Sequence, residues 1–248
     1  MLVHTFLCTM ILAQYSFAQS IILRPGIGFR YYNTNPNYKE PNYFDPSFSG
    51  ELKFSEPAAT IGIEILYPKK SVELVLTSQH APRALKTFFP FAQMGSINYT
   101  IISFRQLQLS YNKFIDLNIG KTKSFLPFAG IGAGIGLNRG AEIYNDTSFT
   151  VYRISSLQYP NEYIDVDVRQ KSLSKFSYSA VFKLGFAFKI KNIERARLYA
   201  VYNFGLNKIA RSTLVYYHTN ARYYGSSTSK GSQFSIMYSM PIYLKRKK

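Results

Sequence analysis

The chain has 248 residues, a formal net charge of +17 and a hydrophobic content of 46%, with 21 Tyr, 20 Phe and no Trp. Its single cysteine, Cys8, excludes a disulfide framework or a thiolate metal site in the rest of the chain. No apolar run of ~20 residues follows the N-terminal segment, which excludes a transmembrane helix there. Many aromatic residues without long apolar runs are typical of lipid-facing strands, in which only every second residue must be apolar.

The N-terminal segment, residues 1–18, predicts a cleaved export signal. An apolar run at 6–13 precedes Ser16-Phe17-Ala18, a small-x-small cleavage site, although residues 1–5 contain no Lys or Arg. A lipoprotein signal would need a small residue before Cys8, and Leu7 stands there. We therefore expect cleavage after Ala18 and a single mature domain at 19–248, with a basic tail at 245–248.

Eight later segments alternate with a period of two, which predicts β-strands. In the clearest of them, 176–190, the even positions are apolar or aromatic, and the odd positions include Ser177, Lys183 and Lys189. Arg105 breaks the parity of its segment, which predicts a β-bulge or the membrane rim near it. In chain order the predicted strands are 21–31, 59–67, 72–77, 101–113, 125–137, 176–190, 198–206 and 234–244.

The segment 125–137 places four glycines, Gly130, Gly132, Gly134 and Gly136, on one face. In a small barrel this face leaves room for large interior side chains from other strands. A phosphate-binding glycine loop is the alternative, but no helix start follows, no lysine is placed as in a Walker motif, and the alternation continues through the glycines.

The connections between these strands alternate between long and short. The long ones are 32–57, 80–100, 138–175 and 209–231, and the short ones are 68–70, 114–124 and 191–196. This is the pattern of an outer-membrane β-barrel, which has short periplasmic turns and long outer loops. The fold class we predict is all-β, an eight-stranded antiparallel up-and-down transmembrane barrel. A soluble β-sandwich is the alternative, but it does not predict this alternation.

Basic residues gather in the predicted periplasmic turns and tail, which hold well over half of the excess positive charge. We assign the segment 189–197, with Glu194 and Arg197, to one of these turns. Such cations reach lipid phosphates from the membrane edge, so membrane lipid is the expected partner and nucleic acid is not. An acidic periplasmic partner for the tail stays an alternative. The predicted phosphate contacts are Lys69, Lys70, Lys121, Lys123, Lys191, Arg195, Lys245, Arg246, Lys247 and Lys248.

The inward positions of the predicted strands carry polar and charged residues. Charges inside a barrel wall should pair, because an unpaired buried charge is costly. The candidate pairs are Arg24 or Arg30 with Glu64, and Glu73 with Lys183. The predicted interior network comprises Arg24, Arg30, Glu64, Glu73, Gln106, Gln108, Lys183 and Asn203. It predicts a lumen filled by side chains, and a narrow gated pore is the alternative.

Catalytic signals are weak in this sequence. His80 lies near Ser78 and His218 near Ser212, but no acidic residue that could orient the histidine stands beside either pair. A lipid A-modifying enzyme stays an alternative, and we expect no enzymatic activity. No His, Asp and Glu cluster has metal-ligand spacing, so no metal or other cofactor is predicted. The first outer connection is rich in Tyr, Asn and Pro and the fourth in Tyr; such loops on a rigid scaffold can bind a ligand, and the alternative is an aromatic girdle at the membrane interface with solvated loops.

The glycine segment carries a family resemblance. Residues 123–136, Lys-Ser-Phe-Leu-Pro-Phe-Ala-Gly-Ile-Gly-Ala-Gly-Ile-Gly, resemble the Pro-aromatic-x-Gly-x-Gly strand of small outer-membrane barrels of Bacteroidota, grouped as OmpA/OmpX-like and PorT-like barrels. The resemblance implies a mostly monomeric barrel of the cell outer membrane, and PorT-like members imply a part in type IX protein secretion. The chain departs from the pattern at its end, since it continues beyond Tyr243 into basic residues instead of ending on an aromatic one.

Overall fold

The computed structural model describes residues 20–34, 52–89, 94–115, 125–138, 145–152, 163–190, 193–218 and 221–246. The expected signal segment therefore lies outside the described residues. The strands are β1 (Ser20–Thr34), β2 (Leu52–Leu66), β3 (Lys70–Phe89), β4 (Met94–Phe114), β5 (Phe125–Leu137), β6 (Asn145–Tyr152), β7 (Tyr163–Ser172), β8 (Phe176–Ile190), β9 (Ile193–Gly205), β10 (Ala210–His218), β11 (Ala221–Ser229), β12 (Gln233–Ser239) and β13 (Ile242–Arg246). In these parts of the chain, no helix is long and apolar enough to cross a membrane.

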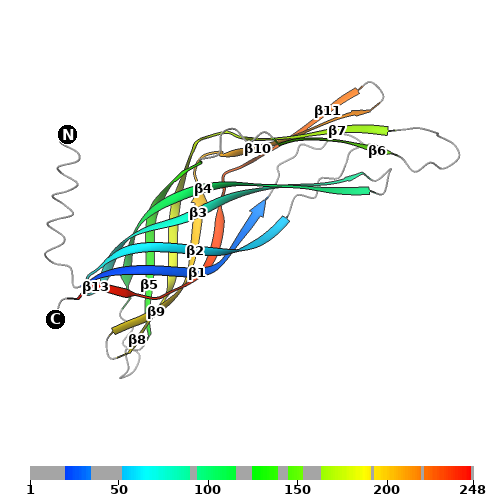
Figure 1. Ribbon diagram of the computed structural model, residues 1–248. Coiled ribbons are helices and arrows are strands. Elements are labelled where there is room, and N and C mark those ends of the chain that lie inside the picture. Colours follow the sequence, from blue (N-terminus) through cyan, green and yellow to red (C-terminus); the bar gives the residue numbers. More distant parts are fainter. Residues whose placement is uncertain are drawn as a thin grey trace, which may run out of the picture.

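The larger sheet closes into an antiparallel barrel (Figure 1). Its order is β12-β9-β8-β5-β4-β3-β2-β1-β13, and β12 also pairs with β1. β12 and β13 lie end to end along β1 and together take the place of one strand in the wall. The barrel therefore has eight strands, as predicted. The register, followed once around from Ile22, passes through Glu64, Glu73, Ser110, Gly132, Val181, Asn203 and Gln233 and returns at Tyr32, ten positions further along β1. This stagger tilts the strands, as closure of a barrel requires.

Alternation sets the two faces of the wall. Along β8 the burial pattern is strictly periodic over most of its length, with Leu184 64% exposed and its neighbour Lys183 buried. The bounds of β5 and β8 agree with the predicted segments, and the other predicted strands, except the last, are longer in the structure. Tyr67, expected on the outer face, is buried, because the chain already turns back there with a bond from Tyr67 N to Lys70 O.

Glycines of β5 allow its neighbours to fill the interior. A Cβ at Gly132 would collide with the backbone of Leu109 and Ser110, and one at Gly134 would lie 2.6 Å from Ser179 Oγ. Side chains from β4 and β8 therefore occupy the space in front of this strand, as its pattern predicts.

The prediction of a continuous last strand at 234–244 was wrong. The strand is divided into β12 and β13 at Met240 and Pro241, opposite Pro25 of β1. Proline has no backbone N–H to donate, so this part of the ladder keeps one bond, from Met240 N to Pro25 O, at 3.2 Å. The pairing of β13 with β1 also contains a register shift between Ile21 and Ile22.

The outer connections are not simply loops, which corrects the expectation for 80–100, 138–175 and 209–231. β3 and β4 continue as a long hairpin, and β11-β10-β7-β6 form a second, four-stranded sheet. This sheet extends from the end of the barrel opposite the one where β1 begins and β13 ends (Figure 1). The four-stranded sheet forms because the connections 138–175 and 209–231 pair with each other through β7 and β10. Alternation within one segment does not reveal such pairing.

No bulge occurs at Arg105, which corrects that half of the expectation. The register runs through it without a shift, from Ser78 on β3 to Leu137 on β5. Arg105 faces outward and is exposed, level with the last residue of β5. β5 ends at this level, and beyond it β4 continues paired with β3.

Candidate functional site

The candidate site is the interior of the barrel. The inward parity of the strands brings all eight residues of the predicted network into it, each at most 5% exposed. With Glu56, Glu194 and Arg197, the ion pairs in the described part of the interior join four cations to four carboxylates. This pairing satisfies the requirement that charges removed from water be paired.

The lower part of the interior contains a closed ring of ion pairs, made by Arg24, Glu64, Arg197 and Glu194. Glu64 receives hydrogen bonds from Arg24 Nε at 2.9 Å and from Arg197 Nη1 at 2.7 Å. Glu194 Oε1 lies 2.8 Å from Arg24 Nη1 and 2.9 Å from Arg197 Nε. Each charge therefore has two opposite charges as neighbours. A ring of this kind holds β1, β2 and β9 together across the lumen.

Aromatic side chains pack beside this ring. The Arg197 guanidinium carbon lies 5.0 Å from the ring centroids of both Phe114 and Phe128. Those two rings are 5.9 Å apart, and Phe128 also lies 6.1 Å from Tyr199. Cation–π contacts strengthen when they are removed from water. The lower lumen is thus filled by a guanidinium and aromatic rings.

A second ion pair lies nearby. Lys183 Nζ donates to Glu73 Oε2 at 2.7 Å and to Ser110 Oγ at 2.9 Å. Lys183 belongs to β8 and Glu73 to β3, so the lysine reaches past β5 at the level of Gly130, its register partner. A Cβ at Gly130 would collide with Asn112 Oδ1, so the Asn112 side chain of β4 occupies the space in front of that glycine.

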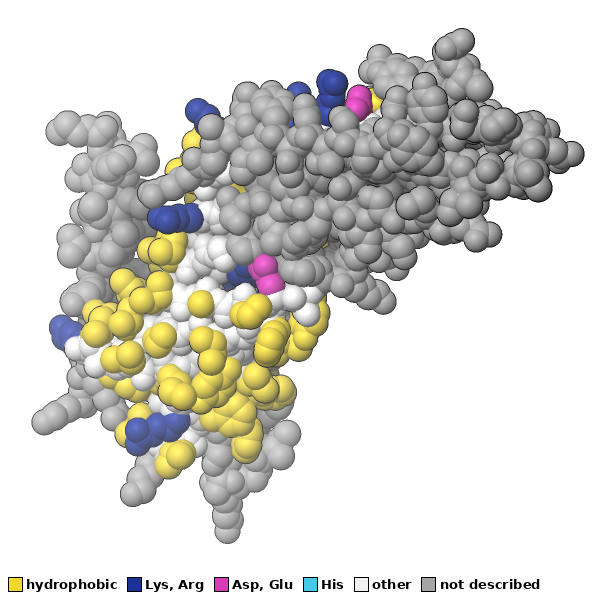
Figure 2. Space-filling view, turned by 45° about the vertical axis from the view of Figure 1, so that its right-hand side comes forward, with side chains coloured by type: hydrophobic (Ala, Val, Ile, Leu, Met, Phe, Trp, Pro, Cys, Tyr) yellow, Lys and Arg dark blue, Asp and Glu magenta, His cyan; other side chains and the backbone are white. Residues whose placement is uncertain are grey.

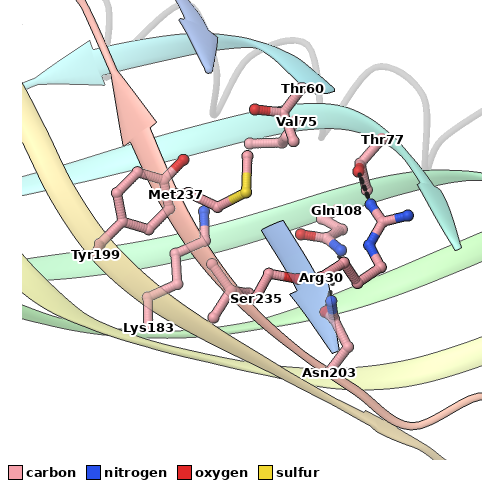
Figure 3. A pocket seen from close by; sticks show the side chains of 11 residues that line it. Arg30, Thr60, Val75, Thr77, Gln108, Lys183, Tyr199, Asn203, Ser235 and Met237 are labelled. Atoms are coloured by element: carbon pink, nitrogen blue, oxygen red, sulfur yellow. Dashed lines mark hydrogen bonds between the residues drawn. The ribbon is translucent and has the colours of Figure 1, made fainter. Parts of the chain in front are cut away.

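In the middle of the lumen, hydrogen-bonded amide side chains lie beside a small cavity that Arg30 and Lys183 also line (Figure 3). Gln108 Nε2 donates to Asn203 Oδ1 at 3.0 Å and to Gln106 Oε1 at 2.8 Å, and Gln106 Nε2 donates to Ser179 Oγ at 2.7 Å. The cavity beside them has a volume of about 20 Å³, enough for about one water molecule.

Arg30 also lines that cavity, and its carboxylate partner differs from the alternative that paired it with Glu64. It donates to Thr77 Oγ1 at 3.0 Å and to Ser78 Oγ at 3.1 Å, and pairs with Glu56 Oε1 at 3.2 Å. Ser78, half of one weak catalytic pair, is therefore engaged by an arginine. The side chains of His80, Ser212 and His218 lie outside the described residues.

Glu194 and Arg197 were predicted to lie in a periplasmic turn, and this prediction was wrong because both are buried in the interior. A β-bulge in β9 explains the error: Phe188 pairs with Ala196 but Lys189 pairs with Glu194, so Arg195 is the extra residue. The bulge turns Glu194 inward although its parity is opposite to that of Arg197. Arg197 shares its odd parity with Tyr199 and Asn203, which indicates that its side chain faces the interior. No pattern in the sequence indicated that Glu194 also faces inward.

The predicted phosphate contacts divide into those the structure describes and those it does not. Lys69, Lys70, Arg195 and Lys245 are exposed, and Lys70 Nζ lies 5.5 Å from the Tyr67 ring. Lys121, Lys123, Lys191, Lys247 and Lys248 lie outside the described residues, as does the side chain of Arg246. Within the described ranges, no group of three or more His, Cys, Asp and Glu could hold a metal ion.

Comparisons with known proteins assign this chain to no family. No protein-family model matches the chain, and no curated protein matches it. One similar solved structure is the crystal structure of the outer membrane protein OprG from Pseudomonas aeruginosa, with 13% identity and a TM-score of 0.38 over 91% of this chain and 97% of that one. The class that the strand pairing itself defines is a closed, eight-stranded antiparallel β-barrel with a charged interior.

Proposed function

We propose that this protein is an integral β-barrel of the bacterial outer membrane, and that it serves envelope structure or surface interaction. The observation that carries the proposal is the inverted distribution of side chains: charges lie inside the barrel and large apolar groups outside. Ile27 is 67% exposed and Ile131 59%, whereas Arg24 and Arg197 are at most 2% exposed.

The apolar groups form a continuous belt on the barrel wall. They cover the face of the barrel seen in Figure 2, and Lys and Arg lie at its margins. Apolar patches on water-soluble monomers rarely exceed a few hundred Å², because larger ones associate. A lipid bilayer accounts for a belt around the wall, and a closed barrel satisfies the backbone hydrogen bonds that lipid cannot.

The filled lumen supports a structural or interaction role over transport. The ion-pair ring, the Glu73–Lys183 pair and the hydrogen bonds around Gln108 occupy the interior, and the described cavity there is about the size of one water molecule. The β3–β4 hairpin and the four-stranded sheet extend beyond the wall. Their paired strands form an ordered surface that a partner protein can contact. A narrow pore would need this network to move aside.

A PorT-like role as an accessory subunit of type IX secretion is a second candidate. The resemblance of residues 123–136 to a strand of Bacteroidota barrels suggests it, and the outer strands provide a surface on which a partner could assemble. A lipid A-modifying activity stays an untested alternative that depends on His80 and His218.

The experiment that tests the proposal uses the full chain expressed in a Gram-negative host. We expect it in the outer-membrane fraction, with faster gel migration before boiling than after, because a folded barrel resists detergent at room temperature. Recovery in the soluble periplasm would contradict the proposal. In-cell crosslinking before extraction then separates the candidates: a stoichiometric envelope partner favours a machine subunit, and a lone barrel favours an autonomous surface protein.

A further inference from the structure

An apolar groove of about 590 Å³ lies on the outer surface of the barrel, over the seam where β12 pairs with β1. The side chains that border it include Ile27, Phe29, Ala59, Leu198, Ile236 and Tyr238. The small side chain of Ala59 makes a depression between larger neighbours. Its volume lies within the range of ~300–1,000 Å³ that ligand sites show.

Aromatic side chains continue the wall above this groove. Tyr202 and Phe204 of β9 have ring centroids 6.5 Å apart, and Tyr31 of β1 lies 6.3 Å from Phe234 of β12. Phe234 and Tyr202 are register partners, so the two pairs form one band across β1, β12 and β9. Such bands mark the interface between hydrocarbon and headgroups.

Cations follow directly above the aromatic band. Lys230 Nζ lies 5.9 Å from the Phe204 ring centroid. Ile209 N donates to Ser229 O at 2.9 Å, which places Lys208 and Lys230 on neighbouring chain segments, and both are exposed, as is Arg211. No acidic residue occurs in this part of the sequence: residues 195–248 contain ten Lys and Arg and no Asp or Glu.

We propose that this surface binds a phosphate-bearing anionic membrane lipid, with its headgroup at Lys208 and Lys230 and an acyl chain in the groove. Along the wall, the cations are followed by the aromatic band and then by the apolar groove. A phosphate-bearing lipid has the matching order of charged headgroup, headgroup–hydrocarbon interface and acyl chain. Phe204, whose ring lies beside Lys230, and Ala200, the register partner of Ile236, are four positions apart on β9, about 13 Å of strand or ~10 Å of depth at a tilt of ~40°, which is a third of a ~30 Å hydrocarbon core. The inference rests on the proposed membrane location.

The absence of Trp allows a test with a single fluorescent reporter. Tyr238→Trp places it in the groove, and Tyr111→Trp, on β4 away from the seam, is the matched control, since both tyrosines face outward and are 38% and 44% exposed. Each full-length variant is refolded into vesicles that mix unlabelled phosphatidylcholine with brominated phosphatidylglycerol or brominated phosphatidylcholine. Quenching then reports which lipid lies beside the reporter.

We expect brominated phosphatidylglycerol to be preferred about fivefold or more over phosphatidylcholine at position 238 and not at position 111. Lys208→Gln combined with Lys230→Gln should remove the preference, whereas Lys69→Gln with Lys70→Gln, at the other end of the barrel, should leave it. Equal quenching at both reporters, or a preference that survives the first double variant, would overturn the lipid site. Quenching by neither lipid at either reporter would instead mean that the wall does not face lipid, and the proposed function would fail first.

Discussion

Arg197 Nη1 lies 2.7 Å from Glu64 Oε1, although 133 positions separate the two residues in the sequence. β9 and β2 are not neighbours in the sheet, so this ion pair spans the lumen. Glu64 is also bonded to Arg24, which makes it the carboxylate on which two buried arginines converge. The wall is thus joined through its interior as well as by its backbone ladder.

Glu64→Gln should destabilise the barrel strongly. The substitution leaves Arg24 and Arg197 with one carboxylate between them, and breaking a buried pair costs about 3–5 kcal/mol. The measurement is the urea midpoint of heat-modifiable migration after refolding into vesicles. Glu56→Gln is the matched control, because Glu56 is 13% exposed at its side chain and its loss should cost clearly less. Equal midpoints for both variants would contradict the importance of the ring.

Gly132→Val should impair folding, whereas Ala133→Val should be tolerated. A Cβ at Gly132 collides with rigid backbone of β4, and overpacking costs about 1–3 kcal/mol. Ala133 faces outward beside it, where the larger valine side chain has room outside the wall. The fraction of refolded protein for the two variants checks the prediction. A well-folded Gly132→Val barrel would show that the strands can move apart at this point.

Leu109→Arg should destabilise the membrane-inserted barrel by about 2–4 kcal/mol, because Leu109 faces outward opposite Ala133, near the middle of β5. Leu244→Arg, on β13 next to Lys245, should cost about 0–1 kcal/mol, because cations are accepted at the membrane edge. Folding free energies in vesicles provide the comparison. A water-exposed wall would give two small and equal costs.

The unmodified protein should give no discrete conductance steps in planar bilayers. Its described interior is occupied by side chains and leaves a cavity of about 20 Å³. Arg197→Ala, which removes a guanidinium from between two aromatic rings and two carboxylates, should allow small steps if the barrel remains folded. Regular steps from the unmodified protein would favour the narrow-pore alternative.

The alternation of side chains predicted much of this molecule. It located the wall strands and assigned Arg24, Glu64, Glu73 and Lys183 to the interior, because a strand has a period of two and the bilayer requires one apolar face. The glycines of β5 likewise predicted space for side chains from other strands, and Asn112, Ser179 and Gln106 occupy it. These features are local, so each strand carries its own signal.

Only the tertiary structure decided which charges meet. The bulge at Arg195 turns Glu194 inward, the stagger of ten positions brings β9 opposite β2, and together they give Glu64 two arginines while Arg30 pairs with Glu56. The outer four-stranded sheet has the same origin. Each of these features depends on pairing between segments far apart in the chain, and alternation within one segment is compatible with many such pairings.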